Sequence, residues 1–252
     1  MLMTRVIPVL LLKNGALVKT VKFGRHSYIG DPVNAIRIYN ELEVDELVFL
    51  DIMASQGQKS INYELLRKIA DECFMPLCYG GGVSHINEIG KILELGFEKI
   101  SLNTWALKDP NLITKAAQKY GSQSIVVSID IRSGLFGKRR VYTRASTKNP
   151  GDPLTWAKNA ETSGAGEILL NSVDRDGTWS GYDIDLITEI TANLSIPVIA
   201  LGGAGSLQDL SDAVVKGGAS AVAAGSMFVY QKKGMGVLIN YPSKNQLKDF
   251  LN

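Results

Sequence analysis

The sequence lacks the marks of secreted and membrane-spanning proteins. It has two cysteines, Cys73 and Cys78, which stand around a predicted buried strand rather than in a CxxC pair. We therefore expect two reduced core thiols, with no disulfide and no metal site, and nothing in the sequence indicates a cofactor. The apolar runs stay short of the ~18 residues that a membrane span needs. The N-terminus also lacks the charged-then-apolar pattern of a signal peptide.

Charge of one sign is also scarce. The 27 basic and 25 acidic side chains leave a formal net charge of +2, and no basic run stands out. Proteins that bind nucleic-acid phosphates usually carry a clustered basic face, so this balance argues against a nucleic-acid partner. Together with the missing membrane and secretion signals, it favours a cytoplasmic protein.

The sequence does contain short apolar runs that alternate with longer segments of helical period. The apolar runs are continuous, which is typical of parallel strands covered on both faces. Strands are predicted at residues 6–11, 46–51, 76–79, 99–102, 124–130, 167–171, 197–200 and 221–224. Helices are predicted at residues 32–42, 64–73, 86–95, 110–120, 153–163, 184–192 and 207–216.

This series of strand–helix units favours a closed (β/α)₈ barrel, an α/β fold of the TIM type. With 252 residues and 45% hydrophobic content, the chain can form one large domain, and we expect residues 1–252 to do so. An open doubly wound sheet is the alternative. In a barrel, the carboxyl ends of the strands and the loops after them form the active face, called the mouth below.

The two halves of the chain resemble each other. Residues 46–51 (ELVFLD) recur as residues 167–172 (EILLNS), and residues 76–82 (PLCYGGG) recur as residues 197–203 (PVIALGG). Two fused half-barrels place equivalent loops opposite each other, so such a protein can hold a substrate at both ends. One position breaks the symmetry, because a strand that ends at Asp130 corresponds to a strand that ends at Leu11.

Glycines and small polar residues follow corresponding strands in both halves. They lie at Gly80–Gly82 and Asn103–Thr104 in the first half and at Gly202–Gly203 and Gly225–Ser226 in the second half. Glycine lets backbone N–H groups approach an anion, and a helix N-terminus adds a favourable dipole. The symmetric set predicts two phosphate sites, although tight turns alone would explain any single pair. The segment 174–177 (DRDG) fits a turn and a ligand contact equally well.

Charged residues occupy both ends of the predicted barrel. Asp130 ends an apolar strand at the mouth, where partial burial would suit it to acid–base work, although a solvated strand-end aspartate is the simpler reading. Asp51 is similarly placed and would orient its neighbours. At the opposite end, the strand N-termini carry Arg5, Glu46, Lys99 and Glu167, which predict a ring of alternating charge. Bottom-face residues usually serve stability. His26 and His85 show no partner pattern.

These residues resemble one family, the cyclase subunit of imidazole glycerol phosphate synthase, HisF. The resemblance covers nearly the whole chain and is carried by residues 5–8 (RVIP), 30–32 (GDP), 45–52 (DELVFLDI), 121–123 (GSQ), 164–170 (GAGEILL), 174–178 (DRDGT), 180–183 (SGYD) and 202–205 (GGAG). It implies a (β/α)₈ barrel and a separate glutaminase partner. Ammonia from that partner would enter at the barrel bottom and react at the mouth with a ribulosyl imidazolecarboxamide ribonucleotide that carries two phosphates. The products would be imidazole glycerol phosphate and aminoimidazole carboxamide ribonucleotide.

The resemblance also implies roles for matching positions. It makes Asp130 one of two catalytic aspartates, Lys19 a flexible-loop lysine that reaches over the substrate, and the four charged bottom residues an ammonia gate. Substrate phosphates would bind at Gly82, Asn103, Thr104, Asp176, Gly177, Gly203, Gly225 and Ser226.

The chain departs from the family where the second catalytic aspartate is expected, because position 11 is leucine. Val9 stands where cysteine is usual, and Trp105 and Arg144 are bulky for their places. The sequence is therefore similar to the family branch linked to glycan amidation, in which the barrel supplies ammonia to a third, synthetase-like protein. An ordinary cyclase with Asp51 or Asp176 as the relocated base, the sister isomerase and a non-enzymatic activator of the glutaminase are the alternatives.

Overall fold

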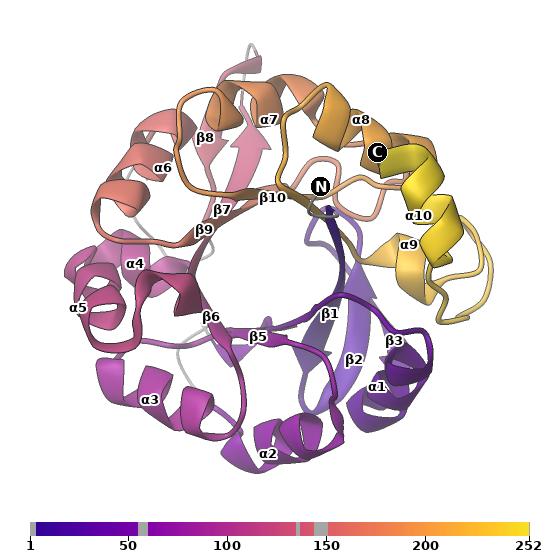
Figure 1. The fold of residues 1–252 in the computed structure, drawn as a ribbon, viewed down its shortest axis with the longest axis horizontal. Coiled ribbons are helices and arrows are strands. Elements are labelled where there is room, and N and C mark those ends of the chain that lie inside the picture. The colour runs from indigo at the N-terminus through magenta and orange to yellow at the C-terminus, as the bar shows by residue number, and fades with distance from the viewer. Residues whose placement is uncertain (1–3, 55–59, 135–136, 144–150, 252) are drawn as a thin grey trace.

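The computed structural model describes residues 4–54, 60–134, 137–143 and 151–251. At its centre, parallel strands form a closed barrel (Figure 1). In order around the barrel, the strands are β1 (Arg5–Lys13), β4 (Leu47–Asp51), β5 (Leu77–Gly80), β6 (Lys99–Leu102), β7 (Ile125–Ser133), β9 (Glu167–Ser172), β10 (Val198–Leu201) and β11 (Ala221–Ala224). β11 pairs in parallel with β1, so the last strand closes on the first. The predicted (β/α)₈ fold is confirmed, and the open sheet is excluded.

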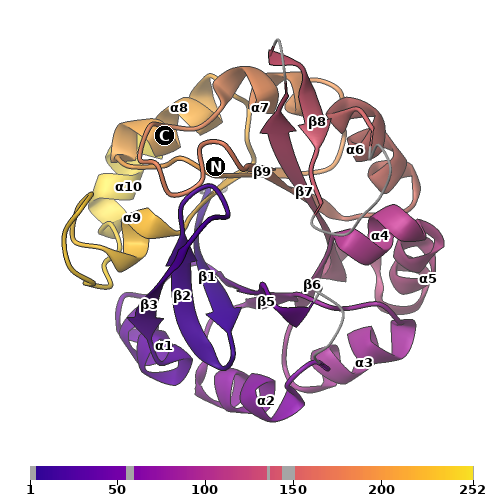
Figure 2. The same cartoon turned by 180° about the vertical axis from the view of Figure 1, so that it is seen from behind.

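Helices cover the outside of the barrel between successive strands (Figures 1 and 2). The predicted helices appear with ends within one residue of the predicted ends. They are α1 (Pro32–Glu41), α2 (Tyr63–Glu72), α3 (Ile86–Glu94), α5 (Asn111–Tyr120), α6 (Pro153–Thr162), α7 (Ile184–Thr191) and α8 (Leu207–Val215). Side-chain caps explain the sharp starts, since Asp31, Asp152 and Ser206 each accept a backbone N–H from the first turn.

Several elements were not predicted. β2 (Ala16–Thr20) and β3 (His26–Gly30) continue antiparallel from β1, and β8 (Arg139–Val141) pairs antiparallel with β7. These extensions rise beside the mouth, one in each half of the chain (Figure 2). The remaining elements are short: α4 (Thr104–Lys108), the 3₁₀ turn η2 (Ser122–Ser124), α9 (Ser226–Val229) and α10 (Lys244–Leu251).

Two apolar layers hold the fold together. The larger layer lies between the sheet and the helices and includes Tyr39, Phe49, Tyr79 and Phe228, each at most 1% exposed. The smaller layer fills the barrel interior with ten buried residues: Ile7, Val9, Val48, Cys78, Val126, Leu169, Ile199, Leu201, Ala221 and Ala223. The alternation of side chains along each strand separates the two layers, because successive residues point to opposite faces.

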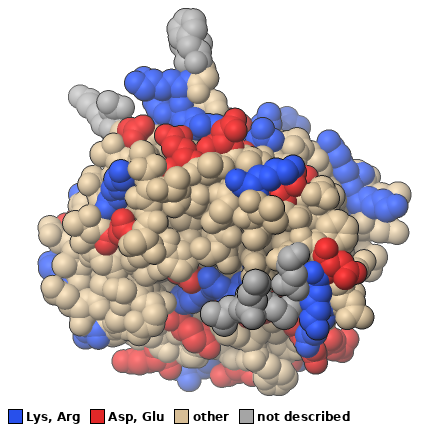
Figure 3. Space-filling model, turned by 45° about the horizontal axis from the view of Figure 1, so that its top comes forward, with Lys and Arg blue, Asp and Glu red and all other residues tan. Residues whose placement is uncertain are grey.

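The surface carries both signs of charge, and basic and acidic side chains are interspersed on the face shown in Figure 3. Within the described ranges, no helix is both long and apolar enough to cross a membrane. Cys73 and Cys78 have free thiols. Among the residues that the structure describes, no group of three or more His, Cys, Asp or Glu side chains could hold a metal ion.

Candidate functional site

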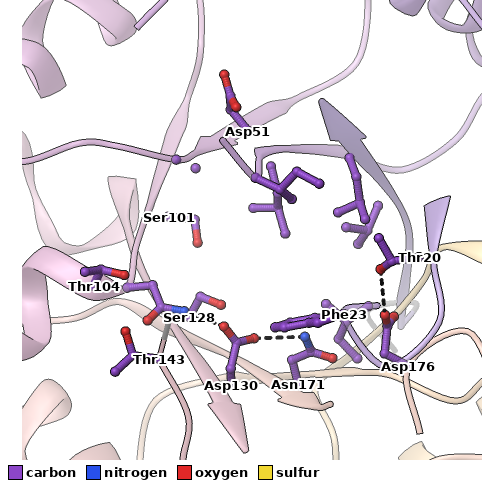
Figure 4. Close-up of a pocket in the computed structure, with 18 of the residues that line it drawn as sticks. Thr20, Phe23, Asp51, Ser101, Thr104, Ser128, Asp130, Thr143, Asn171 and Asp176 are labelled. Atoms are coloured by element: carbon purple, nitrogen blue, oxygen red, sulfur yellow. Dashed lines mark hydrogen bonds between the residues drawn. The ribbon is translucent and has the colours of Figure 1, made fainter. Parts of the chain in front are cut away.

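A cavity opens at the carboxyl ends of the barrel strands, and both halves of the chain contribute to its lining (Figure 4). One part of the lining is apolar and the other part is polar. The apolar part includes Val9, Leu11, Leu50 and Leu201, and the polar part includes Lys19, Thr20, Asp51, Ser101, Asn103, Thr104, Ser128, Asp130, Asn171 and Asp176. This position matches the mouth that the sequence predicts for ligand binding.

Asp130 is fixed by two amide side chains. Asn103 Nδ2 donates a hydrogen bond to Asp130 Oδ2 over 2.8 Å, and Asn171 Nδ2 donates to Asp130 Oδ1 over 2.9 Å. Asn103 follows β6 and Asn171 lies near the end of β9, so the two strands beside β7 orient the carboxylate (Figure 4). Asn171 is 4% exposed, and its Oδ1 atom has no hydrogen-bond partner among the described residues. The arrangement presents one oriented acid to a ligand, whereas the Asn171 oxygen is itself buried.

The strand register makes Leu11 the counterpart of Asp130. Leu11 on β1 pairs with Leu50 on β4, and Asp130 on β7 pairs with Asn171 on β9. Residues 46–51 and 167–172 are the repeated segment, so Leu50 corresponds to Asn171. In the first half, leucines therefore replace both the acid and the amide that orients it. The sequence repeat aligns both positions, and the register shows that each leucine faces the other as Asp130 faces Asn171.

Two other carboxylates line the cavity, but both are bound to backbone or hydroxyl groups. Asp51 Oδ1 accepts hydrogen bonds from the backbone N–H groups of Met53 at 2.9 Å and Ala54 at 3.2 Å. Figure 4 shows the Asp51 side chain turned away from Asp130. Asp176 Oδ2 accepts a hydrogen bond from Thr20 Oγ1 at 3.3 Å. Burial raises the pKa of Asp176, and the nearby Lys19 charge only partly opposes this shift.

Lys19 lies on β2, although the resemblance implies a flexible loop at this position. Its side chain is 6% exposed, and its Nζ atom donates a hydrogen bond to the Val9 carbonyl oxygen. The amine also touches Gly225, where an added Cβ would overlap Nζ. Burial lowers the pKa of Lys19 to about 8, and Asp176 offsets part of the shift.

The predicted phosphate-binding residues are only partly brought together. The cavity lining contains Gly82, Asn103, Thr104, Asp176 and Gly225, whereas Gly177, Gly203 and Ser226 are not part of it.

Two of the glycines outside the lining pack against backbone. Gly177 has a φ of +68°, and an added Cβ there would overlap the Thr20 carbonyl oxygen. Gly203 has a φ of +113°, and an added Cβ there would overlap the Gly181 carbonyl oxygen. The first-half group therefore faces the cavity, and part of the second-half group packs against neighbouring loops.

The four charged residues at the other end of the barrel form one ion-pair network. Arg5 contacts Glu46 over 2.5 Å and Glu167 over 2.6 Å. Lys99 contacts each of these carboxylates over 3.0 Å. The two cations alternate with the two anions across the barrel bottom. Burial opposes the charge on Arg5, but Glu167 and Glu46 outweigh it and raise the Arg5 pKa.

Cys78 belongs to the interior apolar layer, and the charges of this network act on the pKa of its thiol. Burial, reinforced by Glu46, raises the pKa of the Cys78 thiol well above its ordinary value. A neutral, apolar side chain therefore stands between the charged ring and the mouth.

Sequence reasoning missed several polar residues that line the cavity, among them Ser101, Ser128 and Asn171. Ser101 and Ser128 each lie two residues before another lining residue, Asn103 and Asp130 respectively. A period of two places both members of such a pair on one face of the strand, so this spacing was the available signal. Arg144 lies outside the described residues. Trp105 lines the cavity and is 38% exposed.

The fold and the site together define a class of protein. It is a (β/α)₈ barrel with a ligand cavity at the carboxyl ends of its strands and a closed ring of ion pairs at their amino ends. A profile of the family described as "Histidine biosynthesis protein" matches residues 5–234. The chain therefore belongs to this family, in which it is a relative of the HisF subunits of imidazole glycerol phosphate synthase.

Three relatives illustrate the similarity. A Pseudomonas aeruginosa protein, provisionally named imidazole glycerol phosphate synthase subunit hisF2, is 53% identical over 98% of this chain and 99% of its own length. A Vibrio vulnificus protein, provisionally named subunit hisF3, is 45% identical over 100% of this chain and 97% of its own length. The subunit HisF of Alkaliphilus metalliredigens is 42% identical, with 92% of each chain covered.

Proposed function

We propose that this chain is the ammonia-conducting subunit of a glutamine-dependent amidotransferase complex. Its relatives are named as subunits of imidazole glycerol phosphate synthase, so a complex is the expected setting. In this proposal a glutaminase binds at the barrel bottom and releases ammonia there. The ammonia passes through the barrel and leaves at the mouth, and the protein works in the cytoplasm.

The bottom ring and the interior layer support a path for a small neutral molecule. The ion pairs of Arg5 and Lys99 with Glu46 and Glu167 close the barrel bottom, so exchange of one pair would open and shut a gate. Above the ring, the interior is lined by apolar side chains. Burial of a charge costs much more free energy than burial of a neutral group, so ammonia would pass where ammonium would not.

The observation that carries the proposal is the leucine pair at the mouth. Leu11 and Leu50 stand where symmetry with Asp130 and Asn171 would place a second acid and its amide partner. Leucine neither accepts nor donates a proton, and loss of one member of a general acid–base pair typically costs about 10²–10⁴-fold in rate. Asp51, one of the two alternative acids, already accepts two backbone hydrogen bonds.

The ammonia would then serve another acceptor. We assign this role to a third, synthetase-like amidotransferase that builds an acetamidino group on a sugar of a surface polysaccharide. A ring of the charges that the family resemblance implies for a gate, below an altered mouth, is the pattern expected when ammonia delivery is kept and ring closure is lost. Asp130 and the first-half phosphate residues would then hold a phosphorylated ligand rather than complete a cyclase site.

A cyclase assay tests this proposal directly. With excess ammonium salt and the ribulosyl substrate, we expect imidazole glycerol phosphate to form at least about 10²-fold more slowly than with an ordinary HisF subunit. Leu11→Asp should restore part of this rate because it returns a proton carrier opposite Asp130. Leu11→Asn is the matched control, since it has similar size and polarity but does not ionise, and it should restore nothing.

The main alternative is an ordinary cyclase of histidine biosynthesis. The oriented Asp130 and the 42% identity to the Alkaliphilus metalliredigens subunit favour it. Under this alternative, the unchanged protein would turn over within about tenfold of an ordinary subunit, and that result would overturn our proposal. Asp51→Asn and Asp176→Asn would then identify the relocated base.

A further inference from the structure

The mouth contains a buried amine in an environment unlike that of a surface lysine. Lys19 is 6% exposed, lines the cavity and donates a hydrogen bond to the Val9 carbonyl oxygen. Gly225 leaves room for the amine, because a side chain at that position would overlap Nζ. By the strand register, Gly225 is the counterpart of Asn103, so the Lys19 amine occupies the region that an amide fills in the other half.

The surroundings of the amine favour its neutral form. Val9 contributes an apolar side chain to the same cavity, and Leu11 and Leu50 lie on that side of the barrel. Asp176 is the charged group that acts on the Lys19 amine. Burial outweighs the attraction of Asp176 and lowers the pKa of Lys19 to about 8. Buried lysines of this kind are the ones that react as nucleophiles.

The wall of the cavity on the first-half side of the chain, away from Lys19, contains the residues that we expect to contact an anion. Gly82, Asn103 and Thr104 line it on the first-half side of the chain, where we expect a phosphate. Gly82 has a φ of +70°, a backbone conformation that glycine adopts readily, and an added Cβ there would come within 2.7 Å of Ala54. A small molecule with a phosphate at one end and a carbonyl group at the other would fit both features.

We propose that Lys19 forms an imine with small phosphorylated aldehydes and ketones that bind in this cavity. The lone pair of the neutral amine attacks the carbonyl carbon, and a carbon–nitrogen bond forms. Both hydrogens of the amine then leave with the carbonyl oxygen as water, and the C=N bond remains. This activity does not depend on the proposed ammonia transfer and requires no partner protein.

The acidity of Lys19 makes the reaction feasible near neutral pH. A group with a pKa of about 8 is roughly one tenth neutral at pH 7. An ordinary lysine, with a pKa near 10.4, is less than about one part in 10³ neutral at the same pH. Imine formation at Lys19 should therefore rise with pH up to about pH 8 and then level off. A surface lysine should continue to gain reactivity to about pH 10.

Reductive trapping with pyridoxal 5′-phosphate tests the proposal. Cyanoborohydride delivers hydride to the imine carbon, solvent supplies the proton to nitrogen, and the stable amine is located by peptide mass spectrometry. At pH 7 we expect Lys19 to be labelled at least about tenfold faster than the exposed Lys68 on α2. Inorganic phosphate should slow the labelling of Lys19, and pyridoxal without phosphate should label it more slowly.

Variants and controls separate site reactivity from general lysine chemistry. Lys19→Arg and Lys19→Met should each abolish the fast phase of labelling, whereas Lys68→Arg should leave it unchanged. Circular dichroism checks that each variant is folded, and the peptide map of the unchanged protein decides the question if neither Lys19 variant folds. Labelling that is equal at Lys19 and Lys68, or that is unaffected by inorganic phosphate, would overturn the proposal.

Discussion

At the scale of single residues, the chemistry of the mouth depends on which side chains are free to exchange a proton. Asp130 is oriented by two amides, and its counterpart Leu11 has no polar group. Asp176 is different again, because its partly buried carboxylate lies against β2 and accepts a hydrogen bond from Thr20. Ionisation of each acidic side chain therefore has its own effect on the free energy of unfolding, and that effect can be measured.

The partly buried carboxyl of Asp176 should make stability depend on pH. Its pKa is raised in the folded state by burial, so folding favours the protonated form. The resulting stabilisation is present below the unfolded pKa of about 3.9 and is lost as pH rises through the folded pKa. Asp176→Asn, which cannot ionise, should therefore be more stable than the unchanged protein at pH 7.

Urea unfolding at two pH values measures this difference. The gap between Asp176→Asn and the unchanged protein should close near pH 3, where the aspartate is protonated. Asp174→Asn is the control, since Asp174 is about 38% exposed and should change stability little. A variant at position 176 that is equally stable or less stable at pH 7 would show that the contact with Lys19 outweighs burial.

At this scale, the sequence predicted which residues lie at the two ends of the barrel better than it predicted their burial and contacts. Asp130, Leu11 and the four bottom charges were located because each ends or begins an apolar strand. The burial of Lys19 was not predicted, because it depends on β2, and β2 was not recognised as a strand. The pairing of Leu11 with Leu50 required the register between strands, which no local pattern specifies.

At the scale of elements, the two hairpins beside the mouth are the main departure from a plain barrel. β1 and β2 are joined by Asn14 and Gly15, which have φ angles of +52° and +83°. Asn-Gly is the strongest short signal for a two-residue hairpin, so this turn could have been predicted from the sequence. The β7–β8 hairpin has no such dipeptide, and part of its connection lies outside the described residues.

The loop between β10 and α8 is held by close packing at a glycine. Gly203 has a φ of +113°, and the Gly181 backbone N–H donates a hydrogen bond of 2.9 Å to the Gly203 carbonyl oxygen. In Gly203→Ala, the new Cβ would overlap the Gly181 carbonyl oxygen. We expect the free energy of unfolding to fall by about 3 kcal/mol, because the backbone is strained and the neighbouring loop is displaced.

The control isolates the contribution of the backbone angle. Gly234 also has a positive φ, of +77°, but an added Cβ there meets nothing within 4 Å. Gly234→Ala should therefore cost only the strain of the conformation, about 1 kcal/mol. Denaturant unfolding of the two variants gives the comparison. If both variants lost the same free energy of unfolding, the loop at Gly203 would be able to move away from the new Cβ without loss of stability.

At the scale of the whole molecule, the internal repeat predicted most of the architecture. It indicated two equivalent halves, and the parallel pairing of β11 with β1 completes the barrel that such halves form. The repeat did not predict where the halves differ in packing. Gly177 and Gly203, predicted to bind phosphate in the second half, pack against loops, while the residues predicted for the first half line the cavity.

The two ends of the barrel should be separable by mutation if ammonia crosses it. Lys99→Ala or Arg5→Ala removes ion pairs from the bottom ring without touching the mouth. In the complete complex, we expect either change to uncouple glutamine hydrolysis from amidated product severalfold, because ammonia escapes before entry. Activity with added ammonium salt should stay largely intact.

Paired measurements of glutamate release and amidated product check this prediction. Lys68→Ala, in an exposed ion pair on α2, is the control and should preserve coupling. If both ring variants kept full coupling, the ring would be a stability feature rather than a gate.

The unequal halves of the mouth also decide which way round a guest can lie. A barrel with matching acids on both sides would accept an elongated guest in either of two orientations. Here one flank offers a carboxylate between amides and the other offers two leucines beside an amine. A ligand with one polar and one apolar edge would therefore bind in a single preferred orientation. In the reversed orientation, its polar groups would lie against the leucine side chains.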